Sequence, residues 1–356
     1  MAKVLDNKCP GCGAAIHFKP ELGKFKCDYC DGEYTAEQLK DMEKLSKEDE
    51  IDSKKEKKDN YSSYVNYNCP DCGAEIITDE NTAATFCVYC GNTSIIKNRL
   101  SGEFAPKYII PFKMEKKKAI DAFKKLRRGK PLVPKSFTSE KNIEKITGVY
   151  IPFWLYDVEV NGTVNAKATK VTSWSRGNTH YTKTDTYSVI RSGNMKYSRV
   201  PVDGSTRFNN DMMNSIEPFD YEKLIDYNHA YLSGFLAEKY DVSKDDAFVD
   251  AKSRTLKSTR DEMLSSMIGY TSKTITSDDL QSSIKETTYV LLPVWMVNVK
   301  YKDKFYLFAM NGESGKFIGN IPLDKKRALL YTIFVFAISF VLCVAGSYML
   351  FKMGGH

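Results

Sequence analysis

Eight of the nine cysteines in this chain fall into two copies of one pattern. Each copy consists of two Cys-x-x-Cys pairs separated by 14 residues, and every cysteine of the second copy stands 60 positions after its counterpart: Cys9, Cys12, Cys27 and Cys30, then Cys69, Cys72, Cys87 and Cys90. Two such turns joined by a β-hairpin bring four thiolates to the corners of a tetrahedron, the coordination that Zn²⁺ takes in structural sites. The spacing therefore predicts two zinc ribbons with one Zn²⁺ ion each.

The local sequence around each first pair supports a closed structural site. Both pairs read Cys-Pro-x-Cys-Gly, in which proline fixes φ and glycine accepts a left-handed backbone. Iron in a rubredoxin-like site uses the same turn, so spacing alone leaves zinc and iron both open. Disulfides are disfavoured, because the N-terminus has no apolar segment for export. His17 lies inside the first copy, but four thiolates already complete the tetrahedron, and we expect it to be a bystander.

A long apolar segment near the C-terminus is the second strong feature. Residues 328–351 contain no charged side chain, and about 20 apolar residues in a helix span a bilayer core. The preceding basic segment, residues 323–327, carries three cations, whereas only Lys352 follows. The positive-inside rule then predicts a single-pass protein of the cell membrane, with the N-terminal bulk in the cytoplasm and the tail 352–356 outside. Cys343 lies within the span, and we expect it to be an apolar filler.

The composition is that of a globular protein, with 42% hydrophobic and 27% charged residues. We expect an α+β protein: two small N-terminal zinc ribbons, a mixed and largely antiparallel α+β domain, and one C-terminal transmembrane helix. Thr35 and Gln38 form a capping box that predicts a short helix before a charged tether. The predicted parts are zinc ribbon 1 (1–35), a charged helix and linker (36–60), zinc ribbon 2 (61–100), the α+β domain (101–322), the basic segment (323–327), the membrane span (328–351) and the tail (352–356).

Positive charge gathers directly after the second cysteine pattern. Eleven Lys or Arg residues stand against two acids between Lys107 and Lys135, an excess of nine that exceeds the net charge of +7 for the whole chain. Apolar residues recur there at helical spacing, and the cations fall mainly elsewhere on the helix: Lys116, Lys117, Lys124, Lys125 and Arg128. Such a helix packs on its own domain with a solvated lysine face, binds anionic lipid, or binds nucleic acid; the three interpretations stay open.

A second repeat occurs within the α+β domain. Residues 149–158 and 290–299 align at a constant offset of 141, with a proline and a tryptophan at equivalent places. Both copies have the composition of strands, and proline lacks the ladder donor, so each strand should begin, bulge or lie at an edge there. Residues 163–199 predict long antiparallel strands with turns at Gly177 and Gly193. Helical periodicity covers 230–240 and 245–267, with Ser243 or Asp245 as the cap of the second helix.

Motifs for catalysis are absent from the sequence. Histidines such as His180 and His229 have no acid or nucleophile at motif spacing, and no phosphate loop, nucleophile elbow or zincin signature occurs. We therefore do not expect an enzyme, and we keep an unrecognised activity in residues 101–322 as a third hypothesis.

Taken with the proline-tryptophan strands and the apolar span, the paired Cys-Pro-x-Cys-Gly ribbons carry a resemblance. The chain resembles, over essentially its whole length, bacterial membrane-anchored proteins labelled as transcription-factor-IIB-type zinc-ribbon proteins. Ribbons of this type also occur in primosomal helicases and RNA polymerase subunits, and the family has an association with envelope-stress proteins. The family has no settled activity. Ribbons on a charged tether, with a domain and an anchor that hold them at the membrane, favour a cytoplasm-facing adaptor that binds a protein partner there, and the association with envelope stress suits this hypothesis. The alternative is a membrane-associated protein that binds nucleic acid through the ribbons and the basic helix.

Overall fold

The computed structural model describes most of the domain that follows the cysteine patterns and parts of the patterns themselves. Among the predicted features, Cys72, Cys90, residues 42–60 and residues 354–356 lie outside the described residues. The described residues are 9–14, 16–39, 41, 64–69, 74–79, 87–88, 96–98, 106–125, 128, 130, 132–134, 137, 139, 142–143, 145–207, 210–232, 234–301 and 304–353.

An antiparallel pair of long strands forms the centre of the molecule. Strand β8 (Thr147–Arg176) pairs with β12 (Ser272–Tyr301) over most of its length. Around this pair the larger sheet runs in the order β10-β7-β12-β8-β11-β5-β4-β6, with β9 added to β8 and β13 followed by β14 added to β12. The bounds of the added strands are β4 (Tyr64–Asn68), β5 (Glu75–Asp79), β6 (Ile96–Asn98), β7 (Tyr108–Ile109), β9 (Thr179–Asp203), β10 (Ile225–Asp226), β11 (Leu236–Glu238), β13 (Lys304–Asn311) and β14 (Phe317–Gly319). The mixed α+β class is thus confirmed.

Side chains of β8 alternate between two cores on opposite faces of the sheet. Tyr150 and Tyr156 enter one core together with helices α2 (Lys116–Lys125) and α5 (Lys244–Ser265). Ile151 and Phe153 enter the other core with α4 (Asn210–Ile216). The two cysteine segments divide in the same way, because Cys9 and Cys27 belong to the first core and Cys69 and Cys87 to the second. Burial on both faces explains why these strands are so rich in large apolar residues.

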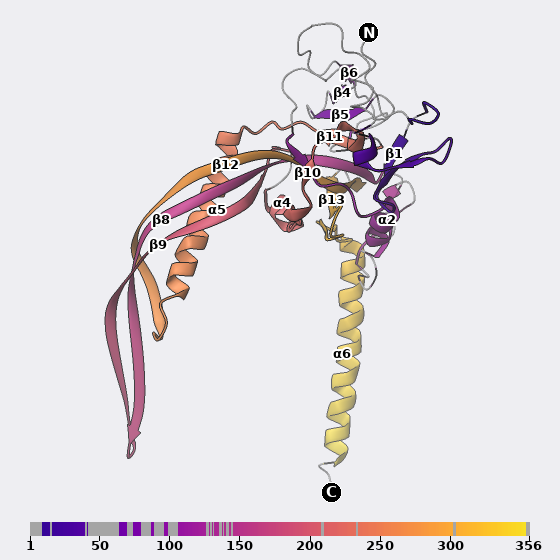
Figure 1. Ribbon diagram of the computed structural model, residues 1–356. Coiled ribbons are helices and arrows are strands. Elements are labelled where there is room, and N and C mark those ends of the chain that lie inside the picture. The colour runs from indigo at the N-terminus through magenta and orange to yellow at the C-terminus, as the bar shows by residue number, and fades with distance from the viewer. Residues whose placement is uncertain are drawn as a thin grey trace.

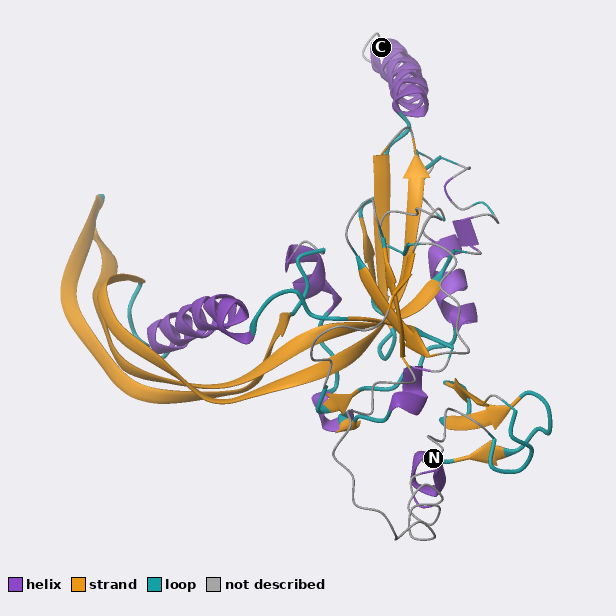
Figure 2. Ribbon diagram, turned by 90° about the horizontal axis from the view of Figure 1, so that it is seen from above, coloured by secondary structure: helices purple, strands orange, loops and turns teal. Residues whose placement is uncertain are grey.

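The outer parts of the long strands leave the body as a curved arm (Figures 1 and 2). Strands β8 and β9 pair up to Arg176 and Thr179, and the turn between them contains Gly177 with φ of 60°. The predicted turn at Gly177 is therefore confirmed. A turn at Gly193 is wrong, because this glycine lies inside β9 and pairs with Gly162 of β8. Helix α5 packs along the arm through Met263, which shares a cluster with Met267 just beyond the helix.

The repeat at offset 141 corresponds to two equivalent halves of the sheet. Val149 of β8 pairs in parallel with Leu236 of β11, and Val290 of β12, its equivalent by sequence, pairs in parallel with Tyr108 of β7. Ile151 and Leu292, which are also 141 residues apart, lie opposite each other in the central pair. A pseudo-twofold axis therefore passes through the middle of the β8–β12 ladder.

The prolines of the repeat lie inside the strands, where the partner strand changes. Next to Pro152, β8 passes from β11 to β9, and next to Pro293, β12 passes from β7 to β13. Their carbonyl oxygens accept equivalent bonds, from the Gly204 N–H to Pro152 and from the Gly312 N–H to Pro293, both 2.8 Å. The prediction that each strand begins, bulges or lies at an edge at its proline is therefore wrong. The physical reason behind it still holds, because the backbone N–H that proline lacks falls where the strand changes its partner.

The two tryptophans of the repeat anchor equivalent loops. The Trp154 indole Nε1–H donates to the Val242 carbonyl at 3.0 Å, and Trp295 Nε1–H donates to the Met114 carbonyl at 2.7 Å. Each accepting carbonyl stands two residues before a helix, α5 in one half and α2 in the other. The two halves thus have the same order, β7-α2-β8-β9 and β11-α5-β12-β13, and each contributes its first strand to the other half.

Two helices were expected between residues 230 and 267. The second, over 245–267, is present, and the first, over 230–240, is not. Helix α5 begins after Ser243, whose side chain accepts the Asp246 N–H as an N-cap. A helix over 230–240 is wrong: a 3-10 turn, η3 (His229–Leu232), is followed by Gly234 with φ of 85° and by strand β11. Packing between β8 and β5 overrides the helical pattern, since all three residues of β11 are buried in the sheet.

The last helix is α6 (Lys325–Met353). Within its segment Lys325–Gly346, the most apolar stretch of 18 residues has a mean hydropathy of 2.6, and none of that stretch is buried within the protein. By length and composition this helix is able to cross a membrane. It leaves the body on the same side as the arm, away from β4, β5 and β6 (Figure 1).

Candidate metal centre

Four cysteines meet at one end of a small three-stranded sheet. The sheet consists of β1 (Ile16–Lys19), β2 (Lys24–Cys27) and β3 (Glu33–Tyr34), and we call residues 9–34 the four-cysteine module. The ligand atoms of Cys9, Cys12, Cys27 and Cys30 all lie within 4.8 Å of one another. Two sulfur pairs, Cys9 with Cys30 and Cys12 with Cys27, are 3.5 Å apart, and none of the four cysteines forms a disulfide. The first predicted ligand set is therefore brought together.

Both cysteine turns have the same backbone geometry. The Cys9 N–H donates to the Ala14 carbonyl and the Gly13 N–H to the Cys9 carbonyl, at 2.6 and 2.8 Å. In the other turn, Asp31 takes the place of Gly13 and donates to the Cys27 carbonyl at 3.0 Å. Gly13 has φ of 74° and Asp31 has φ of 57°, so both residues occupy the left-handed region in which glycine and aspartate are tolerated best.

The charge balance of the site calls for a cation. Burial opposes ionisation of Cys9, but a hydrogen bond with the Tyr34 hydroxyl at 3.5 Å, together with backbone amides, lowers the pKa of its thiol to about 6. The Ala14 amide favours the thiolate of Cys12, yet burial and the three neighbouring sulfurs raise the pKa of Cys12 to about 12. The neighbouring sulfurs thus oppose one another's ionisation at Cys12, and a bound divalent ion would stabilise all four thiolates at once.

The second cysteine pattern is described in part. The Cys69 N–H donates to the Ala74 carbonyl at 2.9 Å, which is the bond that Cys9 makes with Ala14. Cys69 and Cys87 are buried, as Cys9 and Cys27 are. Cys72 and Cys90 lie outside the described residues, so a second four-cysteine group remains a prediction.

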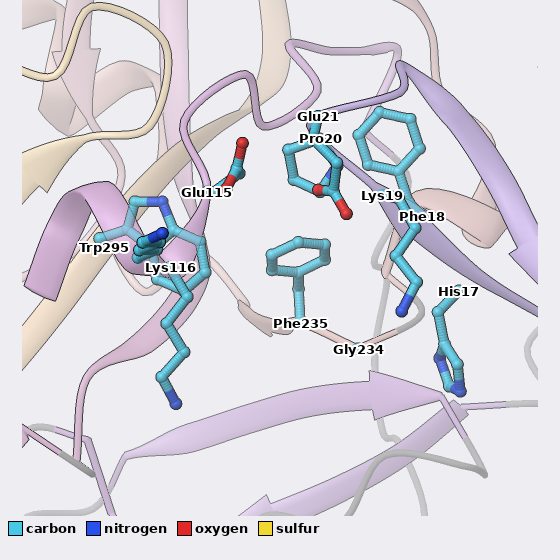
Figure 3. Close-up of a pocket in the computed structure, with 11 residues that line it drawn as sticks. His17, Phe18, Lys19, Pro20, Glu21, Glu115, Lys116, Gly234, Phe235 and Trp295 are labelled. Carbon is cyan, nitrogen blue, oxygen red and sulfur yellow. The ribbon is translucent and has the colours of Figure 1, made fainter. Parts of the chain in front are cut away.

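The four-cysteine module packs on the body of the protein instead of standing apart. Phe18 and Phe25 each contact the Tyr231 ring with centroid distances of 5.1 Å. Between the module and the body lies a cavity of about 380 Å³, lined from the module side by residues 17–21 and from the body by residues 115–117, Gly234, Phe235 and Trp295. Figure 3 shows the rings of Phe235 and Trp295 at this cavity, with charged side chains from both sides around it.

Two residues near the site have places that the cysteine spacing does not reveal. His17 Nε2 lies 4.0 Å from an Asp28 carboxylate oxygen and is not a member of the four-ligand group, as expected for a bystander. Tyr34, which hydrogen-bonds Cys9, has only its position four residues after Cys30 as a signal. The second pattern has Ser94 at that position.

The predicted basic helix is present as α2. Ala119 and Phe123 are buried against the body, while the predicted cations are exposed: Lys116, Lys117, Lys124, Lys125 and Arg128. Burial still lowers the pKa of Lys116, which is one of the residues that line the cavity. The Asp324 N–H donates to the Leu132 carbonyl at 3.1 Å, so the segment after α2 is joined to the residue that precedes α6.

Comparison with known proteins identifies a relative but gives no function. No protein-family model matches the chain, and no solved structure matches it. A protein of Bacillus subtilis (strain 168), named "Uncharacterized protein YdjG", is 34% identical over 324 residues, which cover 91% of this chain and 92% of the relative. Because the match takes in nearly the whole of both proteins, the chain belongs to the same protein family as YdjG.

Proposed function

We propose that this protein is a zinc-binding adaptor, held in the cell membrane by α6, that binds a protein partner on the cytoplasmic side. The observation that carries the proposal is the group of four cysteine sulfurs within 4.8 Å. Tetrahedral zinc with Zn–S bonds of about 2.3 Å places its sulfurs about 3.8 Å apart, within the spread seen here. The resemblance to membrane-anchored zinc-ribbon proteins supports the same assignment, with a second zinc ion at Cys69, Cys72, Cys87 and Cys90.

The exposed end of the four-cysteine module is the surface that suits a protein partner. Tyr29, between Cys27 and Cys30, is 83% exposed. Phe18 and Phe25 are already used against Tyr231. Exposed tyrosine on a rigid turn is a frequent anchor of protein interfaces, because it buries a large area and loses little conformational entropy.

Orientation and lipid contacts follow from the charges near α6. Lys325, Lys326 and Arg327 favour the cytoplasm for the body of the protein. The segment that follows α2, with its exposed lysines, is joined to the residue before α6 by the hydrogen bond from the Asp324 N–H to the Leu132 carbonyl. This connection favours anionic lipid over nucleic acid as the counterpart of the basic helix.

Metal analysis tests the zinc assignment. Full-length protein purified in detergent should contain two zinc ions per chain, and Cys27→Ser should lower the count to one. Cys343→Ser, a matched cysteine change within α6, should leave the count at two. A count of one in the unaltered protein would remove the second site, and a coloured iron centre would replace zinc in the assignment.

Site-specific photocrosslinking in cells tests the adaptor role. A photoreactive amino acid at position 29 should give one discrete adduct with a protein, and the adduct should survive nuclease treatment. The same probe at Val249, which is 66% exposed on α5, serves as the control and should give no such adduct. An adduct that disappears with nuclease would assign the module to nucleic acid, and failure of position 29 to crosslink would place the partner elsewhere.

A further inference from the structure

The side chain of Tyr34 lies against both cysteine turns of the four-cysteine module. Its hydroxyl is 3.5 Å from the Cys9 sulfur. A methyl group added at Gly11, in the first turn, would stand 3.1 Å from this hydroxyl, and one added at Gly32, beside the second turn, would stand 2.9 Å from it. Neither glycine has a positive φ, so the backbone does not require glycine at these positions. The space that the two glycines leave is occupied by the tyrosine.

The backbone on both sides of Tyr34 fixes the place of its ring. Tyr34 belongs to β3 and lies opposite Phe25 of β2. The next residue, Thr35, begins the predicted capping box: its N–H donates to the Gln38 side chain at 2.8 Å, and its own hydroxyl accepts the Gln38 N–H at 3.2 Å. The hydroxyl is therefore held at the Cys9 sulfur by a side chain whose supports are rigid.

The state of the sulfur decides the direction of this hydrogen bond. A cysteine binds Zn²⁺ as a thiolate, which has no proton to donate, so in the metal-bound protein the Tyr34 hydroxyl donates and Cys9 accepts. Four thiolates around one divalent ion leave the centre with an excess of negative charge, and a hydrogen bond to one of them reduces the repulsion among the ligands. Among the described residues, Cys9 is the member of the group that receives such a bond from a side chain other than cysteine.

The second cysteine pattern lacks both the tyrosine and the two glycines. Its residues at the three equivalent positions, 60 places further along the chain, are Asp71, Asn92 and Ser94. The donor is thus replaced by a residue without a ring, and the two positions that make room for the ring carry larger side chains. The three differences occur together, as expected if the glycines are there for the tyrosine.

From the hydrogen bond and the space made for it, we propose that Tyr34 is a positioning residue of the first metal centre, where it donates to the Cys9 thiolate and so strengthens zinc binding. Hydrogen bonds to metal ligands from such outer partners typically account for about 10–100-fold in metal affinity. The first centre therefore keeps its zinc more tightly than the predicted second centre, whose pattern lacks this donor. This inference rests on the proposed binding of zinc.

Packing of the ring is the competing explanation for Tyr34. The side chain is half-buried and packs against the first core, so its removal would also loosen the module. Tyr34→Phe separates the two roles, because it keeps the ring and removes the hydroxyl alone. The matched control is Tyr29→Phe, the same change in the same module on a side chain that is 83% exposed.

Release of zinc to a chelator measures the effect. Full-length protein in detergent is mixed with an excess of a chromogenic zinc chelator, and the loss of both ions is followed in time. We expect two phases, of which the slower is missing in Cys27→Ser. Tyr34→Phe should accelerate the slower phase about tenfold or more and leave the faster phase unchanged, whereas Tyr29→Phe should change neither.

Cobalt supplies a readout that packing alone would not move. Co²⁺ substituted for Zn²⁺ in a four-thiolate site gives absorption bands from charge transfer between sulfur and metal. A hydrogen bond stabilises the electrons of the sulfur that accepts it, so its loss in Tyr34→Phe should shift part of this absorption to longer wavelength. The bands of Tyr29→Phe should stay where they are in the unaltered protein.

The glycine beside the second turn offers an independent check. Gly32→Ala should displace the Tyr34 hydroxyl and accelerate the slower phase, as Tyr34→Phe does. In the Tyr34→Phe protein the closest contact of the added methyl group is gone, so Gly32→Ala should have a smaller effect there than in the unaltered protein.

Four results would count against these statements. Unchanged release and unchanged cobalt bands in Tyr34→Phe would refute the role of the hydroxyl. Faster release without a shift of the bands would assign Tyr34 to packing alone. Loss of the faster phase in Cys27→Ser would refute the order of the two centres. Protein that is purified without zinc would instead refute the zinc binding on which this inference rests.

Discussion

The two halves of the sheet share one framework but differ in what covers their tryptophans. Beside Trp295 lie Phe112 and Phe235, at centroid distances of 5.0 and 5.9 Å, and the four-cysteine module closes over the cavity there. Beside Trp154 lie Tyr240 and Tyr289, both at 5.2 Å. The cavity on this side measures about 520 Å³, and all its lining residues come from the body.

This difference separates the repeated part of the protein from the added parts. The proline and glycine contacts, the tryptophan bonds and the helix positions recur in both halves. The four-cysteine module packs beside Trp295 and not beside Trp154, and the arm extends from strands of both halves. We infer that the repeated halves of the sheet give the protein its rigidity, and that the parts without a counterpart, the four-cysteine module and the arm, carry out its function.

The largest expected effect comes from breaking the proposed metal site, which should disturb the surroundings of Trp295 and spare those of Trp154. Cys27→Ser should unfold the four-cysteine module, because structural zinc contributes about 10–16 kcal/mol to the folding of such modules. Its loss removes Phe18 and Phe25 from Tyr231. Hydrogen exchange should then accelerate in β1, β2 and η3, while α5, beside Trp154, keeps its protection.

The control for this prediction is Cys343→Ser, which should leave every one of these amides protected. Loss of protection in α5 together with the four-cysteine module would contradict the independence of the two tryptophan environments. It would show that the stability of the whole sheet depends on the module.

The tryptophans allow a direct comparison of the halves. Trp154→Ala and Trp295→Ala each remove a largely buried indole and its hydrogen bond and should cost about 3–5 kcal/mol in the free energy of unfolding. Combined with Cys27→Ser, the Trp154 change should add to the cost of the cysteine change, because their surroundings are separate. The cost of the Trp295 change should be less than additive with that of Cys27→Ser, because unfolding of the module already exposes the cavity beside Trp295. Denaturant unfolding of the two double variants measures these costs.

A structural feature of this protein can be predicted from the sequence when it depends on the residue types of a short segment, and not when it depends on contacts between distant segments. The turns of the first cysteine pattern, the cap at Ser243, the apolar segment of α6 and the proline-tryptophan repeat depend on neighbouring residues, and the structure has each of them. Strand β11 escapes prediction, because its three residues become a strand only through burial between β8 and β5. The contact of Phe18 with Tyr231 joins residues more than 200 positions apart, and no spacing rule predicts it. The arm is predicted as strands, but Thr and Ser on both faces give no alternation from which to infer its length.

A smaller effect is expected at the position before each repeated glycine. Asp203 stands where the other half has Asn311, and burial, with Asp250 and Asp241 nearby, raises the pKa of its carboxyl from 3.8 to about 6. Between pH 4 and pH 6 the folded protein therefore binds a proton that the unfolded chain has released. The stability contribution of Asp203 is largest below this window and is lost as the pH rises through it.

Asp203→Asn should remove this pH dependence and make the first half like the second. At pH 7 the variant should be more stable than the unaltered protein, by at most about 3 kcal/mol, and the two should converge near pH 4. Thermal unfolding across pH 4–7 measures both quantities. An unchanged pH profile would show that another group titrates in this range.

The smallest expected difference lies at the glycines that follow. A methyl group added at Gly312 would stand 2.7 Å from the Phe112 ring and 2.8 Å from Pro293, whereas one at Gly204 would stand 3.2 Å from Tyr240 Cβ. Gly312→Ala should therefore cost about 1–3 kcal/mol in the free energy of unfolding and Gly204→Ala less. Since the close atoms at Gly312 include the Phe112 ring, Phe112→Leu should recover part of the cost of Gly312→Ala. Tyr240→Leu keeps the Cβ that Gly204 meets and should recover nothing, so equal rescue in both halves would contradict the difference between these two contacts.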